Sequence, residues 1–176
     1  MIHFHIIGTD HSLQKASSLD TGLKAVLETA IAQYAPVLIA EEVNANENVM
    51  TFGRELVGED KWLSIDMTDD ERTNAGIFND LKNTPDKELG PNGFYRVNVY
   101  LKRAEGIREN FWIDKIISKC SEIGISAGAI IITCGINHLE FLADKLLSRN
   151  PKPEITKDRY IPYNLEERYG KFRIDP

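Results

Sequence analysis

The stretch IIGTDH at residues 6–11 closes an apolar run with a glycine and places a histidine three residues after that glycine. The stretch ITCGINH at residues 132–138 repeats this Gly-x-x-His pattern near the other end of the chain. Only four histidines occur in the 176 residues, and two of them occupy the pattern. Glycine lets the chain turn sharply off a strand and brings backbone close to a ligand. The doubled pattern therefore predicts two strand ends that meet at one site.

Apolar runs of strand length alternate with segments of helical periodicity along most of the chain. Strands are predicted at residues 2–8, 37–40, 62–66 and 127–134. Helices are predicted from Ser18 or Asp20 to about Tyr34, at 44–57, from Thr68 or Asp69, at about 98–123 (with Gly106 as a candidate break) and at 137–149. This alternation predicts an α/β fold, a three-layer sandwich with a mostly parallel central sheet flanked by helices.

A chain of this length is expected to form a single domain over residues 1–176. Its core is placed at about 1–150, and the tail at 151–176 is expected to pack on that core. Residues 79–94, with two prolines and two glycines, predict a surface excursion, either a lid over a pocket or a plain solvated insertion. If the protein works as a homo-oligomer, Tyr160, Tyr163 and Tyr169 are interface candidates; intramolecular packing is the other interpretation.

Composition excludes several classes of protein. With 42% hydrophobic and 27% charged residues, the chain is neither disordered nor fibrous. The net charge of −6 argues against a nucleic-acid partner. No stretch approaches the ~20 apolar residues of a membrane span, and no signal peptide is expected at the N-terminus. Cys120 and Cys134 form neither a disulfide framework nor a metal-binding pair, which favours a cytoplasmic location.

Polar residues gather at the carboxyl ends of the predicted strands, the edge where open α/β sheets bind ligands. They are His11 after the first strand, Glu41 and Glu42 after the second, Asp66 at the end of the third and His138 after the last. A helix N-terminus beside either histidine is expected to lower its pKa and keep the ring neutral, as a metal ligand or general base must be. Two histidines and a carboxylate can hold a divalent metal that activates water, or can catalyse hydrolysis without metal. In the structural alternative, Asp10 and Asn137 cap helices and both histidines bond to backbone.

Three motifs in this order resemble those of the superfamily that groups TraB, Tiki, ChaN-like haem-binding and erythromycin-esterase-like proteins. They are Gly8-Thr9-Asp10-His11, Ala40-Glu41-Glu42-Val43 and Gly135-Ile136-Asn137-His138, and the resemblance covers about residues 2–147. The family's strand-end pattern points to Glu42, with Glu41 as fallback. Arg108 resembles an arginine that begins the helix before the last core strand and would hold a carboxylate or an anionic substrate group; otherwise it is a surface residue paired with a nearby acid. The chain is shorter than most members, and with no secretion signal or membrane segment expected it departs from the membrane-tethered Tiki pattern and the surface-bound ChaN pattern.

The resemblance implies a metal-assisted or His-dependent hydrolase that acts on an amide or ester bond of a small-molecule or peptide substrate. His11, Glu42, His138 and Arg108 would be its catalytic residues, and His11, Glu42 and His138 would hold a divalent metal ion such as Zn, Mn or Co. The alternative is a non-catalytic binding protein that holds haem, a metal ion or a small anion at the same His/Glu site.

Overall fold

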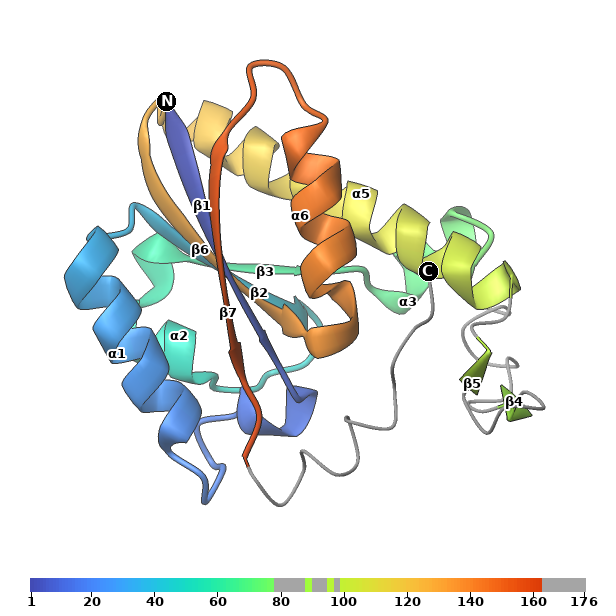
Figure 1. The fold of residues 1–176 in the computed structure, drawn as a ribbon, viewed down its shortest axis with the longest axis horizontal. Helices are drawn as coiled ribbons and strands as arrows, with labels where there is room; N and C mark the ends of the chain where they lie inside the picture. Colours follow the sequence, from blue (N-terminus) through green and yellow to red (C-terminus); the bar gives the residue numbers. More distant parts are fainter. Residues whose placement is uncertain (78–87, 90–94, 97–98, 163–176) are drawn as a thin grey trace.

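Five strands form one all-parallel sheet in the order β3-β2-β6-β1-β7 (Figure 1). The structure is a computed structural model and describes residues 1–77, 88–89, 95–96 and 99–162. The strands of the sheet are β1 (Ile2–Thr9), β2 (Leu38–Asn44), β3 (Trp62–Asp66), β6 (Gly128–Gly135) and β7 (Glu154–Tyr160). β4 (Glu88–Leu89) and β5 (Tyr95–Arg96) form a separate antiparallel pair.

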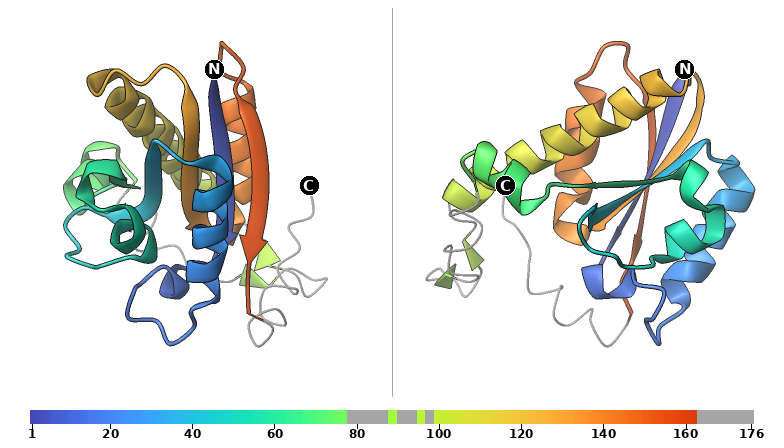
Figure 2. Two further views of the ribbon diagram at one scale, coloured as in Figure 1. Left: turned by 90° about the vertical axis from the view of Figure 1, so that its left-hand side faces the viewer. Right: turned by 180° about the vertical axis from the view of Figure 1, so that it is seen from behind.

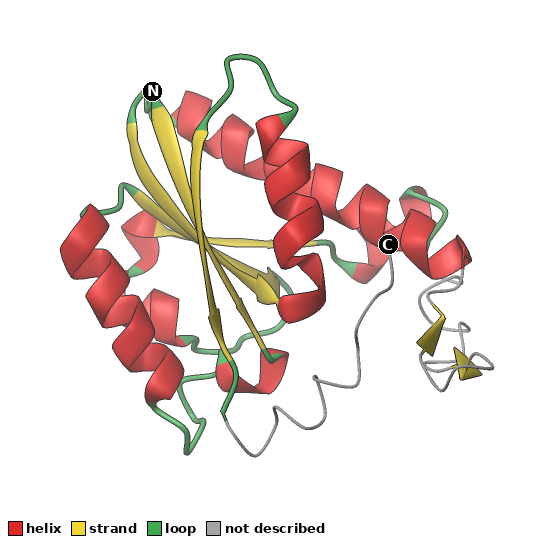
Figure 3. Ribbon diagram, viewed as in Figure 1, coloured by secondary structure: helices red, strands yellow, loops and turns green. Residues whose placement is uncertain are grey.

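Helices cover both faces of the sheet, so the predicted three-layer α/β sandwich is confirmed (Figures 1 and 3). One face carries α1 (Gly22–Tyr34) and α2 (Phe52–Val57), and the other carries α5 (Val99–Glu122) and α6 (Leu139–Leu147). The shorter elements are α3 (Asp69–Asn74) and the 3-10 turns η1 (His11–Leu13), η2 (Glu59–Lys61) and η3 (Ile136–His138). In the described part of the chain, no helix is long and apolar enough to cross a membrane.

The two-residue period of the strands divides the core into two apolar clusters. On β2, Leu38 and Ala40 pack toward α5 and α6, whereas Ile39 packs toward α1 and α2. All three side chains are fully buried. β2 continues past this run to Asn44, beyond its predicted end at residue 40. The neighbouring acids Glu41 and Glu42 therefore lie within the strand and project to opposite faces of the sheet.

The helix predicted at 44–57 is wrong for its first half. Only α2 forms there, because β2 extends to Asn44 and the chain then turns, with Oδ1 of Asn44 accepting the backbone N–H of Asn46 at 2.9 Å. Asparagine side chains compete with the helical backbone in this way. Thr51 then caps α2 by accepting the backbone N–H of Arg54. α5, by contrast, is unbroken at Gly106, so the break considered there is also wrong.

The fifth strand, β7, comes from the segment that was expected only to pack as a tail. It pairs with β1 over seven positions, from His3 opposite Glu154 to Thr9 opposite Tyr160. Its sequence EITKDRY is mostly polar because β7 forms the outer edge of the sheet, so it lacks the apolar run that marks the inner strands. Tyr163, Tyr169 and most of the excursion at 79–94 lie outside the described residues.

The connections around β6 diverge to opposite faces of the sheet. The chain leaves β1 through η1 toward α1, and it leaves β2 toward α2 on that same face. The chain leaves β6, which lies between them, through η3 toward α6 on the other face (Figure 2). Such a switch point opens a crevice at the carboxyl ends of the strands. His11 and His138 follow the two diverging strands β1 and β6.

Candidate functional site

The carboxylate of Glu42 is the centre of the site, and its side chain is only 1% exposed. Nη2 of Arg108 donates to Oε1 of Glu42 at 2.7 Å, and the backbone N–H of Gly135 donates to Oε2 at 2.7 Å. Nε2 of His11 lies 3.7 Å from Oε1, and Nε2 of His138 lies 3.6 Å from the same oxygen. The four residues named from the sequence thus meet at one carboxylate.

The two motif glycines allow this convergence, as expected from the sequence. A Cβ on Gly135 would lie 2.7 Å from Nε2 of His11 and 3.4 Å from Oε2 of Glu42. A Cβ on Gly8 would lie 2.8 Å from the side chain of Ile136. At both positions a side chain would therefore force a neighbouring side chain to shift, because real Cβ contacts are not that short. At the turn itself, Oδ1 of Asp10 accepts the backbone N–H of Ser12 at 2.8 Å and fixes η1, which carries His11.

Arg108 is locked into a buried ion-pair network rather than lying on the helix surface. Its Nε and Nη2 donate to Oδ1 of Asp66 at 3.1 and 3.0 Å, and its Nη1 donates to Glu105 at 2.8 Å. Burial alone would lower the pKa of Arg108, but Glu42, Asp66 and Glu105 outweigh burial and raise it. Arg72 donates to the other oxygen of Asp66 at 2.6 Å. Arg108 lies well inside α5, not at its start as the resemblance implied.

The protonation of Asp66 follows from the same contacts. Burial would raise the pKa of this carboxyl, but the charges of Arg108 and Arg72 outweigh burial and hold the pKa below its usual range. The indole N–H of Trp112 also donates to Oδ1 of Asp66, at 3.2 Å. Asp66 is therefore an anion that anchors two guanidinium groups at the end of β3.

His138 departs from the expected neutral state. Its Nδ1 lies 2.9 Å from Oε1 of Glu109, and its Nε2 lies 3.2 Å from Oε2 of Glu105, so both nitrogens face carboxylates. Burial would lower the pKa of His138, but Glu42, Glu109 and Glu105 outweigh it and raise the pKa. The predicted lowering by a helix N-terminus is therefore wrong, because three nearby carboxylates dominate. The raised pKa favours the imidazolium form of His138, which has no bare nitrogen for a metal or a substrate proton.

A pocket of about 400 Å³ opens beside Glu42, between η1 and the loop at 43–51. Its wall includes His11, Lys15, Glu42, Asp66 and Arg108, but not His138. The apolar side chains of the wall are Val43 and Val49, so the lining is mainly polar. A haem macrocycle needs an extended apolar slot, and this lining does not favour one. A small polar substrate suits the pocket better.

Glu41, the fallback for Glu42, lies on the opposite face and outside the pocket wall. Its side chain is buried among neutral donors: the hydroxyls of Thr51 and Thr133 and the indole N–H of Trp62, which donates at 2.6 Å. Burial raises the pKa of Glu41, although these donors and the backbone N–H of Gly53 oppose the rise. These contacts connect the start of α2 to β2, β3 and β6, so the role of Glu41 is to stabilise the packing of these elements.

A metal ion does not fit the predicted donor set. In the described ranges, no group of three His, Cys, Asp or Glu side chains is arranged to hold one. Oε1 of Glu42 already accepts from Arg108, whose positive charge would repel a divalent cation, and both nitrogens of His138 are committed to carboxylates. Zn, Mn or Co bound to His11, Glu42 and His138 stays a prediction from the sequence alone.

Comparisons of the chain with models of protein families, with curated proteins and with solved structures found no match. The resemblance to the TraB, Tiki, ChaN-like and erythromycin-esterase-like superfamily therefore remains a prediction based on three short motifs. The function must be argued from the geometry of the site.

Two acids that shape the site were missed in the sequence. Glu105 and Glu109 lie on α5 beside Arg108 and contact His138 from the same helix face. With Arg108 and Trp112 they form a set at i, i+3, i+4 and i+7, the spacing of one helix face. Charged residues in an otherwise apolar stripe were the signal that could have found them.

Proposed function

We propose that this protein is a hydrolase that cleaves an amide or ester bond in a small-molecule or peptide substrate bound beside Glu42. One observation carries the proposal: His11 and Glu42, with 3.7 Å between Nε2 and Oε1, form part of the wall of a pocket at the carboxyl ends of the strands. The pocket lies at the switch point of the sheet, the usual place for ligands in this architecture.

His11 is the proposed general base. Its side chain is 59% exposed, so a water molecule can reach the ring. With Nε2 toward Glu42, Nδ1 is the nitrogen that would take a proton from that water as it attacks the carbonyl carbon. The Glu42 carboxylate would then stabilise the imidazolium that forms, and the imidazolium would return its proton to the leaving amine or alkoxide as the C–N or C–O bond breaks. The separation of 3.7 Å exceeds a hydrogen bond, and such contacts commonly shorten when substrate binds.

Glu42 and Lys15 complete the proposed machinery. Arg108 donates to one oxygen of Glu42 and the Gly135 N–H donates to the other, so the carboxylate is held in one orientation. Lys15 lines the pocket and has no carboxylate partner among the residues described. We propose that the Lys15 ammonium stabilises the negative charge that develops on the carbonyl oxygen in the transition state. Arg108 is a positioning residue because three carboxylates already surround its guanidinium.

The test is a panel of p-nitrophenyl esters and N-acyl p-nitroanilides, assayed with wild type and His11→Gln. Loss of a general base typically lowers kcat by about 10²–10⁴-fold. Because the His11 side chain is exposed, its replacement should leave Tm nearly unchanged. His3→Gln, a change outside the pocket wall, is the matched control. Turnover that His11→Gln leaves intact would contradict the assignment.

A non-catalytic binder of small anions is the second candidate, favoured by Lys15 in the wall of the pocket. The two candidates differ in whether a bound molecule is turned over. Saturable binding of a small carboxylate such as acetate that is weakened in Lys15→Gln, with no turnover of any substrate in the panel, would favour the binder.

A further inference from the structure

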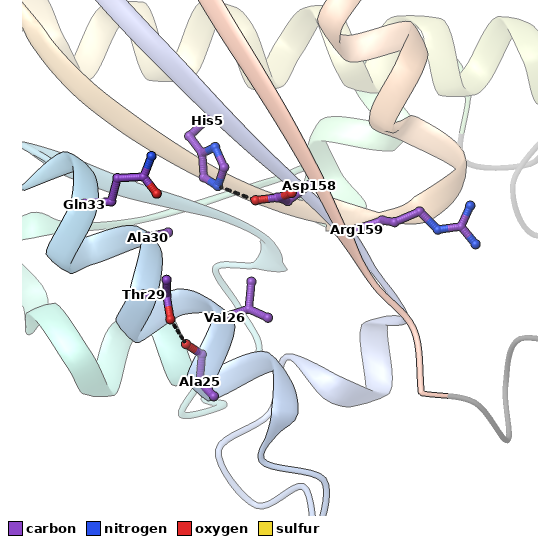
Figure 4. Close-up of a pocket in the computed structure, with 8 residues that line it drawn as sticks. All are labelled: His5, Ala25, Val26, Thr29, Ala30, Gln33, Asp158 and Arg159. Carbon is purple, nitrogen blue, oxygen red and sulfur yellow. Dashed lines mark hydrogen bonds and ion pairs between the residues drawn. The ribbon is translucent and has the colours of Figure 1, made fainter.

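A second hollow, of about 350 Å³, lies between α1 and the edge strand β7 (Figure 4). Its helical wall includes Ala25, Thr29 and Gln33, spaced by four residues, and the small side chains of Ala25 and Thr29 leave room above the sheet. His5 and Asp158 form its floor and its β7 side. None of these described wall residues belongs to the pocket beside Glu42.

His5 supplies the unusual polar atom of this hollow. The residue is 2% exposed, and Nδ1 of its ring lies 2.8 Å from Oγ1 of Thr156. Nε2 of the same ring is buried and has no hydrogen-bond partner in the described part of the chain. The nearest charge is Oδ2 of Asp158 at 3.5 Å, toward which the ring points (Figure 4). A buried polar atom left unpaired is costly, so a partner for Nε2 is expected.

The hydrogen-bond pattern decides what kind of partner this is. Oγ1 of Thr156 also lies 2.9 Å from Nε2 of His3, and its single proton can be donated to only one of the two rings. If Thr156 donates to His3, the His5 ring must donate through Nδ1 and keeps a bare lone pair on Nε2. An N–H on Nε2 would instead form a short, charge-assisted bond to Asp158, near 2.7–2.9 Å. At 3.5 Å, Nε2 and the Asp158 carboxylate make no hydrogen bond, and with a bare Nε2 both are acceptors for one donor between them.

The surrounding charges agree with this arrangement. Burial lowers the pKa of His5, Asp158 raises it and His3 lowers it, with a net lowering that favours the neutral ring. Asp158 projects to the α1 side of β7. Arg159, the next residue along the strand, also lines the hollow, but its guanidinium is turned away from it (Figure 4). The Thr29 hydroxyl donates to the carbonyl of Ala25 at 2.9 Å and does not compete for His5.

We propose that this hollow binds the ammonium group of a small primary amine. The ammonium donates to Nε2 of His5 and to the Asp158 carboxylate, and the carbonyl oxygen of Gln33 at the rim is a third acceptor. The alkyl part of the amine lies on Ala25, Val26 and Ala30. An ammonium is a compact charge with three donors, which matches a site of converging acceptors. The proposal is independent of the hydrolase.

The test is a titration of the full chain with n-butylammonium chloride at constant ionic strength, followed by the ring ¹⁵N signals of His5. A saturable shift of Nε2 is expected, and the uncharged isostere n-butanol should give none. Asp158→Asn should weaken binding by about tenfold or more, the loss expected for a hydrogen bond to a charged group. Asp158 is 64% exposed, so this variant should fold. Asp114→Asn, which changes another exposed carboxylate, should bind as wild type does.

A second pair of variants tests the shape of the hollow without changing its charge. Ala25→Leu narrows the end of the hollow away from His5, where the alkyl part would lie, and should weaken the binding that the shift reports (Figure 4). Ala32→Leu makes the same change on α1 outside the hollow and should not. The proposal is overturned if n-butylammonium gives no saturable shift, if n-butanol binds equally well, or if Asp158→Asn and Ala25→Leu bind as their controls do.

Discussion

The loops after β1 and β6 begin from the same Gly-x-x-His motif but place their histidines in different surroundings. The His11 side chain is 59% exposed on a pocket wall, whereas that of His138 is 8% exposed among three carboxylates. The loop after β1 opens toward the crevice, and the loop after β6 runs directly into α6, against α5. The comparison teaches that the face of the sheet toward which a loop turns, rather than its motif, decides the surroundings of the histidine. One histidine is exposed on a pocket wall, and the other is buried in an ion-pair network.

The largest expected effect that tests this comparison is on stability. His138→Ala removes the cation that Glu109 and Glu105 face and should lower the free energy of unfolding by about 3–5 kcal/mol, the usual cost of breaking a buried ion pair. His11→Ala should change it by about 0.5 kcal/mol or less, because the side chain is exposed. Urea denaturation of both variants measures the difference. Equal costs would mean that the two histidines do not differ as described.

The two glycines provide the next test. Gly8→Ala places a methyl group 2.8 Å from Ile136 and 3.2 Å from Leu139 in the core and should cost about 1–3 kcal/mol by overpacking. Gly135→Ala meets the exposed ring of His11, which can move aside, so the loss of stability should be smaller and the loss of turnover larger. Thermal unfolding and kcat, measured on both variants, separate the two effects. A Gly135→Ala protein with full turnover would show that the contact between His11 and Glu42 is not needed.

The pH dependence of stability gives a smaller, signed effect. The pKa of His138 is raised in the folded protein, so its proton stabilises the fold fully below the unfolded-state value of about 6.5. This contribution should be lost as pH rises through the higher folded-state pKa. The difference in unfolding free energy between wild type and His138→Gln should therefore shrink above about pH 6.5. A difference that grows over that range would show the opposite shift.

The smallest expected signal is the metal content. Protein purified without a His tag should contain no stoichiometric Zn, Mn or Co, since Arg108 and Gly135 bind both oxygens of Glu42. Elemental analysis, repeated on His11→Ala, measures this. One metal per chain in wild type that disappears in the variant would restore the metal-assisted mechanism.

Much of the fold could be predicted because the inner strands are buried on both faces, so their sequences are continuous apolar runs, as in β6. β7 could not, since an edge strand needs no such run. The meeting of His11, Glu42 and His138 followed from strand direction alone. The protonation of His138 did not, because it depends on Glu105 and Glu109, which lie on α5, 33 and 29 residues before His138 in the sequence. Charge at a buried site is set by contacts between segments that the order of residues does not show.

β7 has one more consequence, for the assembly of the chain rather than its chemistry. Without β7, β1 would be the edge strand of the sheet, with its backbone N–H and C=O groups unpaired on one side. By pairing along β1, β7 covers these groups and the isoleucine-rich sequence of that strand. In its place it presents Lys157, Asp158 and Arg159, charged residues of the kind that discourage other chains from adding a strand. A protein truncated before Glu154 would expose β1 as an edge strand, to which a second copy of the chain could add by strand pairing.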